Sequence, residues 1–86
     1  MTARTVLVVD DDPHIRDVLR FALEKEGMIV HEAADGREGL RKALQLGPDL
    51  IVLDVMMPEM SGLDMCREYR KTAETPILFL SSRDDE

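Results

Sequence analysis

The chain has 86 residues, enough for one small domain with a correspondingly small hydrophobic core. Hydrophobic residues make up 44% and charged residues 34%, a balance typical of folded globular domains rather than of disordered or membrane-spanning chains. The net charge of -7, from 18 acidic and 11 basic residues, argues against direct nucleic-acid binding.

The same sequence offers no membrane or export signal. The longest apolar run, residues 6–9, is far too short for a membrane span or a signal-peptide core. The single cysteine, Cys66, excludes an internal disulfide framework and a multi-cysteine zinc site. We therefore expect a cytoplasmic protein that has no membrane contact.

The first predicted element is a buried strand over residues 4–9, because the run VLVV is continuous and mostly β-branched. Asp12 and Pro13 then form an N-cap and first-turn pair. An amphipathic helix is predicted from there to Gly27, with apolar residues at helical spacing: Ile15, Val18, Leu19, Ala22 and Leu23.

Residues 28–33 are predicted as a second, outer strand, closed by the turn pair at residues 35–36. A second helix follows and ends at Gly47 and Pro48; its apolar residues are Leu40, Ala43 and Leu44. The run at residues 50–53 is the next buried strand, and like the first it ends in an acid, Asp54.

A loop over residues 55–60 leads to a third predicted helix, residues 61–71, with Leu63, Cys66 and Tyr69 on one side. Pro76 opens a fourth strand, residues 77–80, that ends at Ser81. Alternating strands and helices predict an α/β domain with a parallel sheet and helices on both faces. No repeat or linker divides the chain.

Acids follow two of these strands where each ends. The carboxyl ends of parallel strands meet at one edge of a sheet, so Asp10, Asp11, Asp54 and Ser81 are expected to become neighbours. If the first strand is central, the strand order reverses between the first and third strands and opens a crevice there. The three acids would line this crevice.

Three clustered carboxylates need a counterion. Two carboxylates about 4 Å apart repel by roughly 4 kcal/mol at an effective dielectric constant of about 20. Ligands that are all oxygen favour Mg²⁺, Mn²⁺ or Ca²⁺ over zinc, and a site of few carboxylates suits Mg²⁺. With Asp10 and Asp11 as a metal-holding pair and Ser81 nearby, Asp54 is the candidate nucleophile for phosphoryl transfer.

Four segments in order carry a family resemblance: VLVVDDDP, EAADGREGL, LDVMMPEMSG and PILFLSS. Together they resemble the receiver domain of bacterial two-component response regulators, over essentially the whole chain. The resemblance implies a flavodoxin-like, doubly wound parallel sheet with strand order 2-1-3-4. It also implies that a histidine kinase phosphorylates Asp54 in the presence of Mg²⁺.

The resemblance implies roles for the other site residues as well. Asp11 would bind the metal directly and Asp10 mainly through water, while Met56 would offer its backbone carbonyl. Ser81 would be the switch hydroxyl that moves to the phosphoryl group. Asp12 is assigned to the helix cap rather than to chemistry.

The chain also departs from the family pattern. A complete receiver continues through a fourth helix, a fifth strand and a fifth helix, so residues 1–86 are expected to be its N-terminal two-thirds. The lysine that follows the fifth strand in the family has no counterpart, since Lys71 precedes the fourth strand. The fourth strand should then be an exposed edge, through which two copies could pair or exchange an element.

Three functions remain open at this point. The first is a non-enzymatic phospho-acceptor module that acts on an unidentified output domain or partner. The second is a receiver fragment that is not phosphorylated and serves oligomerisation. The third is a small phosphatase with an aspartate nucleophile, since Asp10 and Asp12 form a D-x-D that resembles haloacid-dehalogenase phosphatases.

Overall fold

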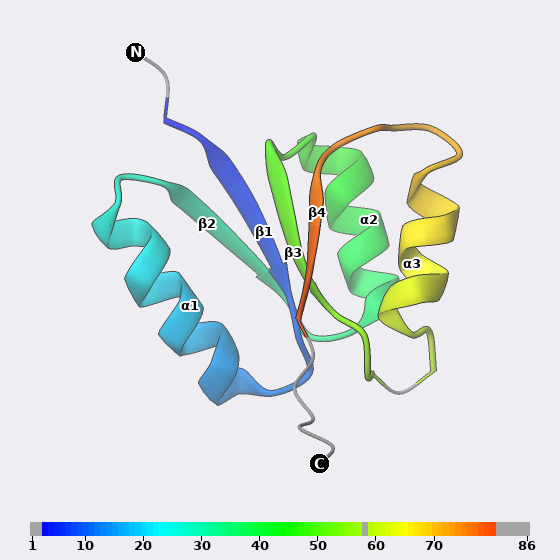
Figure 1. Ribbon diagram of the computed structural model, residues 1–86, viewed down its shortest axis with the longest axis horizontal. Coiled ribbons are helices and arrows are strands. Elements are labelled where there is room, and N and C mark those ends of the chain that lie inside the picture. The colour runs from blue at the N-terminus through cyan, green and yellow to red at the C-terminus, as the bar shows by residue number, and fades with distance from the viewer. Residues whose placement is uncertain (1–2, 58, 81–86) are drawn as a thin grey trace.

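The computed structural model describes residues 3–57 and 59–80. Strands and helices alternate along this part of the chain (Figure 1). In chain order they are β1 (Thr5–Val9), α1 (Pro13–Lys25), β2 (Ile29–Ala33), α2 (Gly36–Leu46), β3 (Leu50–Asp54), α3 (Gly62–Tyr69) and β4 (Ile77–Leu80).

The four strands form one parallel sheet in the order β2-β1-β3-β4. Val8 of β1 lies beside Glu32 of β2 and Val52 of β3, which fixes the register across the centre of the sheet. Helix α1 covers one face, and α2 and α3 cover the other (Figure 1). The predicted α/β, flavodoxin-like class and strand order are confirmed.

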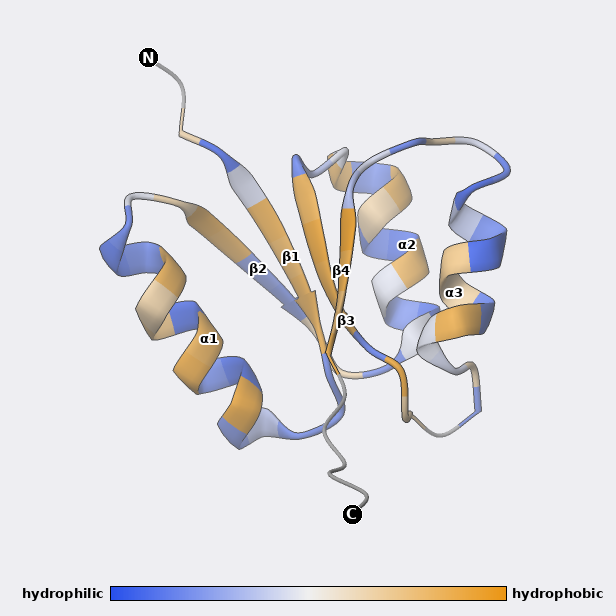
Figure 2. Cartoon of the chain, viewed as in Figure 1, coloured by the Kyte–Doolittle hydropathy of each residue, from blue (hydrophilic) through white to orange (hydrophobic). Residues whose placement is uncertain are grey.

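The central strands are buried on both faces. In β1, Val6 and Val8 pack toward α1 while Leu7 and Val9 pack toward α2 and α3. The central strands β1 and β3 are accordingly mostly apolar, whereas β2 also carries polar residues and the helices alternate between polar and apolar residues (Figure 2). Continuous apolar runs therefore predicted these strands well, because a strand covered on both faces needs no polar side.

The predicted helix boundaries are largely confirmed by their caps. The Asp12 side chain accepts a hydrogen bond of 2.9 Å from the backbone N–H of His14, so Asp12 is the N-cap of α1. At the end of α2, Gly47 adopts a left-handed φ of 59°, a conformation that costs glycine little. Both ends lie where the sequence predicted them.

The prediction for α3 was partly wrong. The helix ends at Tyr69 rather than Lys71, and the Leu63 side chain is 52% exposed. Tyr69 is buried as predicted, and Met65, which was not predicted, lies four residues before it on the same buried face. Of the predicted residues, Cys66 is only partly buried.

Two other surfaces remain open in the described chain. Val18 and Ala22 of α1, which were predicted within its apolar stripe, are exposed. No strand within residues 3–57 or 59–80 pairs with the outer edge of β4, and its residues Leu78 and Phe79 are 54% and 40% exposed. The predicted exposed edge is therefore found.

Within the residues that the structure describes, no helix combines the length and the apolar character needed to cross a membrane. The longest, α1, has 13 residues.

Candidate functional site

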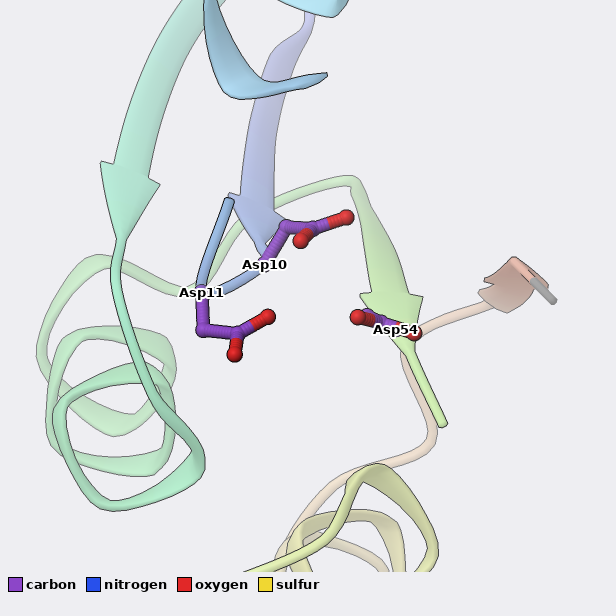
Figure 3. Close-up of side chains that lie close together, drawn as sticks. All are labelled: Asp10, Asp11 and Asp54. Carbon is purple, nitrogen blue, oxygen red and sulfur yellow. The ribbon is translucent and has the colours of Figure 1, made fainter. Parts of the chain in front are cut away.

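Three carboxylates meet at the edge of the sheet where β1 and β3 end. Asp10 directly follows β1, Asp11 comes next, and Asp54 is the last residue of β3. One oxygen of each lies within 4.8 Å of the others, and the three side chains point into a common space (Figure 3). The predicted convergence of these residues is therefore present in the structure.

Asp10 is the most constrained of the three. Its backbone N–H donates to the carbonyl oxygen of Ala33 at 3.1 Å, and its Oδ1 accepts from the N–H of Asp12 at 2.9 Å. Its Oδ2 is buried and has no hydrogen-bond partner among the described residues. A buried carboxylate oxygen without a partner costs free energy unless a ligand or a proton reaches it.

The electrostatics of the cluster agree with this geometry. Burial raises the pKa of Asp10 above its ordinary value, and the negative charges of Asp54, Asp11 and Asp12 raise it further. Only the hydrogen bond from the backbone of Asp12 acts in the opposite direction. The site therefore favours any species that brings positive charge to Asp10.

Asp54 is held by the loop that follows it. Its side chain is 1% exposed, and its Oδ1 accepts a hydrogen bond of 3.1 Å from the backbone N–H of Met56. The start of α3 lies against the same backbone, because a Cβ atom at Gly62 would overlap the carbonyl oxygen of Asp54. Glycine at this position lets the helix approach the end of β3 closely.

The remaining predicted residues have different outcomes. Met56 lies next to the cluster through its N–H, and its side chain is exposed. The role predicted for its carbonyl stays a prediction. Ser81, the predicted switch hydroxyl, lies outside the described residues.

Arg16, which was not predicted from the sequence, also lies at this site. Its Nη1 donates to the backbone carbonyl oxygen of Asp10 at 2.7 Å, and its Nε donates to Glu32 at 3.0 Å. A sequence signal existed: Arg16 and Arg20 are four residues apart on the first predicted helix, and an acid stands on the neighbouring strand. Charges at this spacing usually form a solvated face, so the pattern alone does not identify Arg16 as part of the site.

The donor set fits a hard divalent cation such as Mg²⁺. It consists of carboxylate oxygens from two strand ends, and one of those oxygens is buried without a partner. No other group of three His, Cys, Asp or Glu side chains with ligand spacing occurs in the described part of the chain. The structure also has a cavity of about 570 Å³ beside α2 and α3, but none of the three acids lines it.

Comparison with known proteins identifies the family of this chain. A protein-family model, the response regulator receiver domain, matches residues 6–86. The chain belongs to this family. The match covers nearly the whole sequence, so the resemblance inferred from four short segments is confirmed.

Solved structures of other receivers are closely similar. The chemotaxis protein CheY4 of Vibrio cholerae is 37% identical with a TM-score of 0.82, over 98% of this chain and 72% of that one. The response regulator TrrA of Thermotoga maritima, solved in complex with Mg²⁺ and beryllium fluoride, is 38% identical with a TM-score of 0.87, over 93% and 70%.

A third similar structure comes from a plant kinase. The receiver domain of the histidine kinase CKI1 of Arabidopsis thaliana, complexed with Mg²⁺ and beryllium fluoride, is 33% identical with a TM-score of 0.83. The alignment covers 96% of this chain and 68% of the CKI1 receiver-domain chain.

Proposed function

We propose that this receiver domain is the phospho-acceptor of a two-component pathway and that Asp54 accepts the phosphoryl group from a histidine kinase. One observation carries the proposal: Asp10, Asp11 and Asp54 converge within 4.8 Å at the point where the strand order reverses between β1 and β3. Ligands of doubly wound sheets bind at such a point. Membership of the receiver family supports the same conclusion.

The orientation of Asp54 suits an attack on phosphorus. The N–H of Met56 donates to Oδ1 and restricts the rotation of the carboxylate, so Oδ2 would be the attacking atom. In this step the new bond forms between Oδ2 and phosphorus while the phosphorus–nitrogen bond of a phosphohistidine breaks. The leaving nitrogen keeps the electron pair and takes up a proton.

Bound Mg²⁺ would neutralise charge on the phosphoryl oxygens. Asp11 and Asp54 would hold the ion directly, Asp10 through water, and Met56 through its carbonyl; Mn²⁺ could take its place. Two similar receivers were solved with Mg²⁺ and beryllium fluoride, which supports this choice of metal. Ser81 would supply the switch hydroxyl.

The consequences for the cell follow from the charge change. A phosphoryl group adds about -1.5 to -2 charges, which would shift a two-state surface that a separate output domain or partner reads. The domain would act as an acceptor rather than as an enzyme on separate substrates. The net charge of -7 makes direct nucleic-acid contact by this segment unfavourable. We also propose that the protein acts in the cytoplasm.

The proposal is tested by phosphorylation with acetyl phosphate and Mg²⁺, followed by intact mass measurement. The wild-type chain should gain the mass of one phosphoryl group, and Asp54→Asn should not. Asp12→Asn is the matched control, because asparagine keeps the cap of α1 and the changed acid is only two positions from Asp10. Modification that persists in Asp54→Asn would contradict the assignment.

The metal site has a separate test. Mg²⁺ at about 100 times its Kd should stabilise the native wild-type protein by about 2.7 kcal/mol, which thermal unfolding detects. Asp11→Ala should abolish this rise, because it removes the exposed ligand and leaves the buried core unchanged. An equal Mg²⁺ response in the variant would overturn the role of Asp11.

The edge of β4 supports a second candidate function, self-association. Leu78 and Phe79 lie on opposite faces of this strand, both exposed, and its outer backbone groups pair with no strand of the described chain. Such an edge is a template for pairing with a second copy. Oligomerisation could then be a role of the domain that does not depend on phosphorylation.

A further inference from the structure

Arg16 connects three parts of the fold. It is the fourth residue of α1, and its guanidinium group reaches the carbonyl oxygen of Asp10 just after β1 and the carboxylate of Glu32 on β2. The Arg16 and Glu32 side chains are only 18% and 24% exposed, so solvent screens this pair less than a surface pair. The planar guanidinium group can bind both acceptors at once.

The contact with Asp10 has a geometric consequence. The carbonyl group that Arg16 binds belongs to the planar peptide unit between Asp10 and Asp11. Holding this unit restricts ψ of Asp10 and φ of Asp11, and therefore the direction in which both side chains leave the backbone. The N–H of Asp10 is already held by Ala33, so Arg16 completes the fixation of this turn.

Glu32 in turn holds Arg16 in place. Its carboxylate accepts from Arg16 through Oε1 and from Arg20 through Oε2, the latter at 2.6 Å. These two arginines lower the pKa of Glu32 and keep it ionised. The positive charge of Arg16 is thus paired away from the acidic cluster, where an unpaired guanidinium group would compete with a metal ion for the carboxylates.

Arg20 provides an internal comparison. It binds the same Glu32 carboxylate and also the carbonyl oxygen of Val30, so it ties α1 to β2 as Arg16 does. It makes no hydrogen bond to Asp10 or Asp11 within the described residues. The two arginines therefore share the structural tie between α1 and β2 but differ in their contact with the acidic turn.

We propose that Arg16, held by Glu32, is a positioning residue for the metal site: it fixes the Asp10–Asp11 peptide unit so that both carboxylates face Asp54. The inference rests on the proposed function, because it assumes that these acids bind Mg²⁺. It adds two residues, Arg16 and Glu32, that contact neither the metal nor the phosphoryl group.

The experiment compares the Mg²⁺ affinities of Arg16→Met and Arg20→Met by isothermal titration calorimetry on the 86-residue chain. Loss of a group that orients a metal ligand typically costs 10- to 100-fold in affinity. Arg16→Met should therefore raise the Kd for Mg²⁺ by about 10-fold or more. Arg20→Met should leave the Kd nearly unchanged although it also loosens α1.

Two further measurements separate positioning from stability. Without metal, hydrogen exchange of the Asp12 amide should accelerate in Arg16→Met and not in Arg20→Met, because that amide donates to Asp10. Arg16→Lys should restore part of the affinity, since lysine keeps one donor for the Asp10 carbonyl. Glu32→Gln should weaken Mg²⁺ binding by releasing Arg16 toward the acids.

The outcomes are distinguishable. If the wild-type chain binds Mg²⁺ and both arginine variants lose affinity equally, or Asp12 exchange is unchanged in Arg16→Met, the positioning role is overturned while the metal site stands. If the wild-type chain binds no Mg²⁺, the proposed metal site fails and this inference fails with it.

Discussion

At the scale of single residues, Asp10 is the member of the site whose negative charge is least favourable. The side chain is 1% exposed, one of its oxygens lacks a hydrogen-bond partner among the described residues, and its pKa is raised mainly by burial. The sequence predicted that the three acids would meet, because each follows a strand end. It did not predict that Asp10 is buried while Asp11 is exposed, since burial depends on packing across the sheet.

Asp10→Asn should stabilise the protein when no metal is present. Asparagine keeps an acceptor for the N–H of Asp12 and removes one of three charges that lie within 4.8 Å. We expect the free energy of unfolding at pH 7 in EDTA to rise by about 1–2 kcal/mol, measured by urea unfolding.

Asp12→Asn serves as the control for this prediction. It also removes an acid, but one whose side chain caps α1 in an exposed position. Asparagine is an equally good N-cap, so its effect should stay within about 0.5 kcal/mol. A less stable Asp10→Asn protein in EDTA would refute the view that Asp10 is strained by its charge.

At the scale of elements, α1 is attached to β2 through charge as well as through the partly buried Leu19 and Leu23. No residue of α1 is fully buried, and Glu32 of β2 accepts hydrogen bonds from Arg16 and Arg20. Hydrophobic periodicity located the helix but could not show this attachment, because the partners are separated by 16 and 12 residues. Which surface charges pair is decided by tertiary packing.

Tertiary packing also explains why the buried face of α3 was predicted incorrectly in part. Apolar residues stand at positions 63, 65, 66 and 69, so two helix faces could serve as the buried side. The close approach of Gly62 to the backbone of Asp54 sets the rotation of the helix. This rotation places Met65 in the core and Leu63 in solvent.

The attachment of α1 predicts a pH dependence. The pKa of Glu32 is lowered from its ordinary value of 4.5, first by Arg20, so the unfolded state binds a proton more readily than the native state. The stability that Glu32 contributes is therefore complete above pH 4.5 and is lost as the pH falls through the lower, native pKa.

Glu32→Gln should accordingly cost about 1 kcal/mol at pH 7 and progressively less below pH 4.5. Urea unfolding of both proteins between pH 7 and pH 3 measures this difference. Glu24→Gln is the control, because its ion pair with Arg20 is more exposed and should contribute little at any pH. A constant difference for Glu32→Gln across this range would contradict the assignment.

At the scale of the whole molecule, the described chain leaves apolar surface open on α1 and along β4. Phe21 is exposed on the helix, and Leu78 and Phe79 are exposed on the edge strand. An open strand edge with exposed apolar side chains beside it is prone to association. The edge of β4 favours a more specific association than the surface of α1, because its backbone groups pair with no strand of the described chain and can form hydrogen bonds of defined direction.

Self-association through β4 should depend on concentration in sedimentation velocity. Leu78→Lys and Phe79→Lys, on opposite faces of the strand, should each raise the dimer dissociation constant by about 10-fold or more, because lysine on an edge strand opposes pairing. Phe21→Lys is the matched control: it removes an exposed aromatic residue away from the edge and should leave the constant unchanged. Equal effects of all three would point to non-specific hydrophobic association instead.

The sequence by itself determined the alternation of strands and helices along the chain, the start of α1 at Asp12, the end of α2 at Gly47 and the identity of the three converging acids. These features depend on local patterns: continuous apolar runs, helical spacing, capping residues and the rule that parallel strands end at one edge. Only the tertiary structure decided which acid is buried, how α3 is rotated, and that Arg16 contacts both Glu32 and the carbonyl oxygen of Asp10. Those features arise from contacts between residues far apart in the chain, and no local pattern of residue types encodes such contacts.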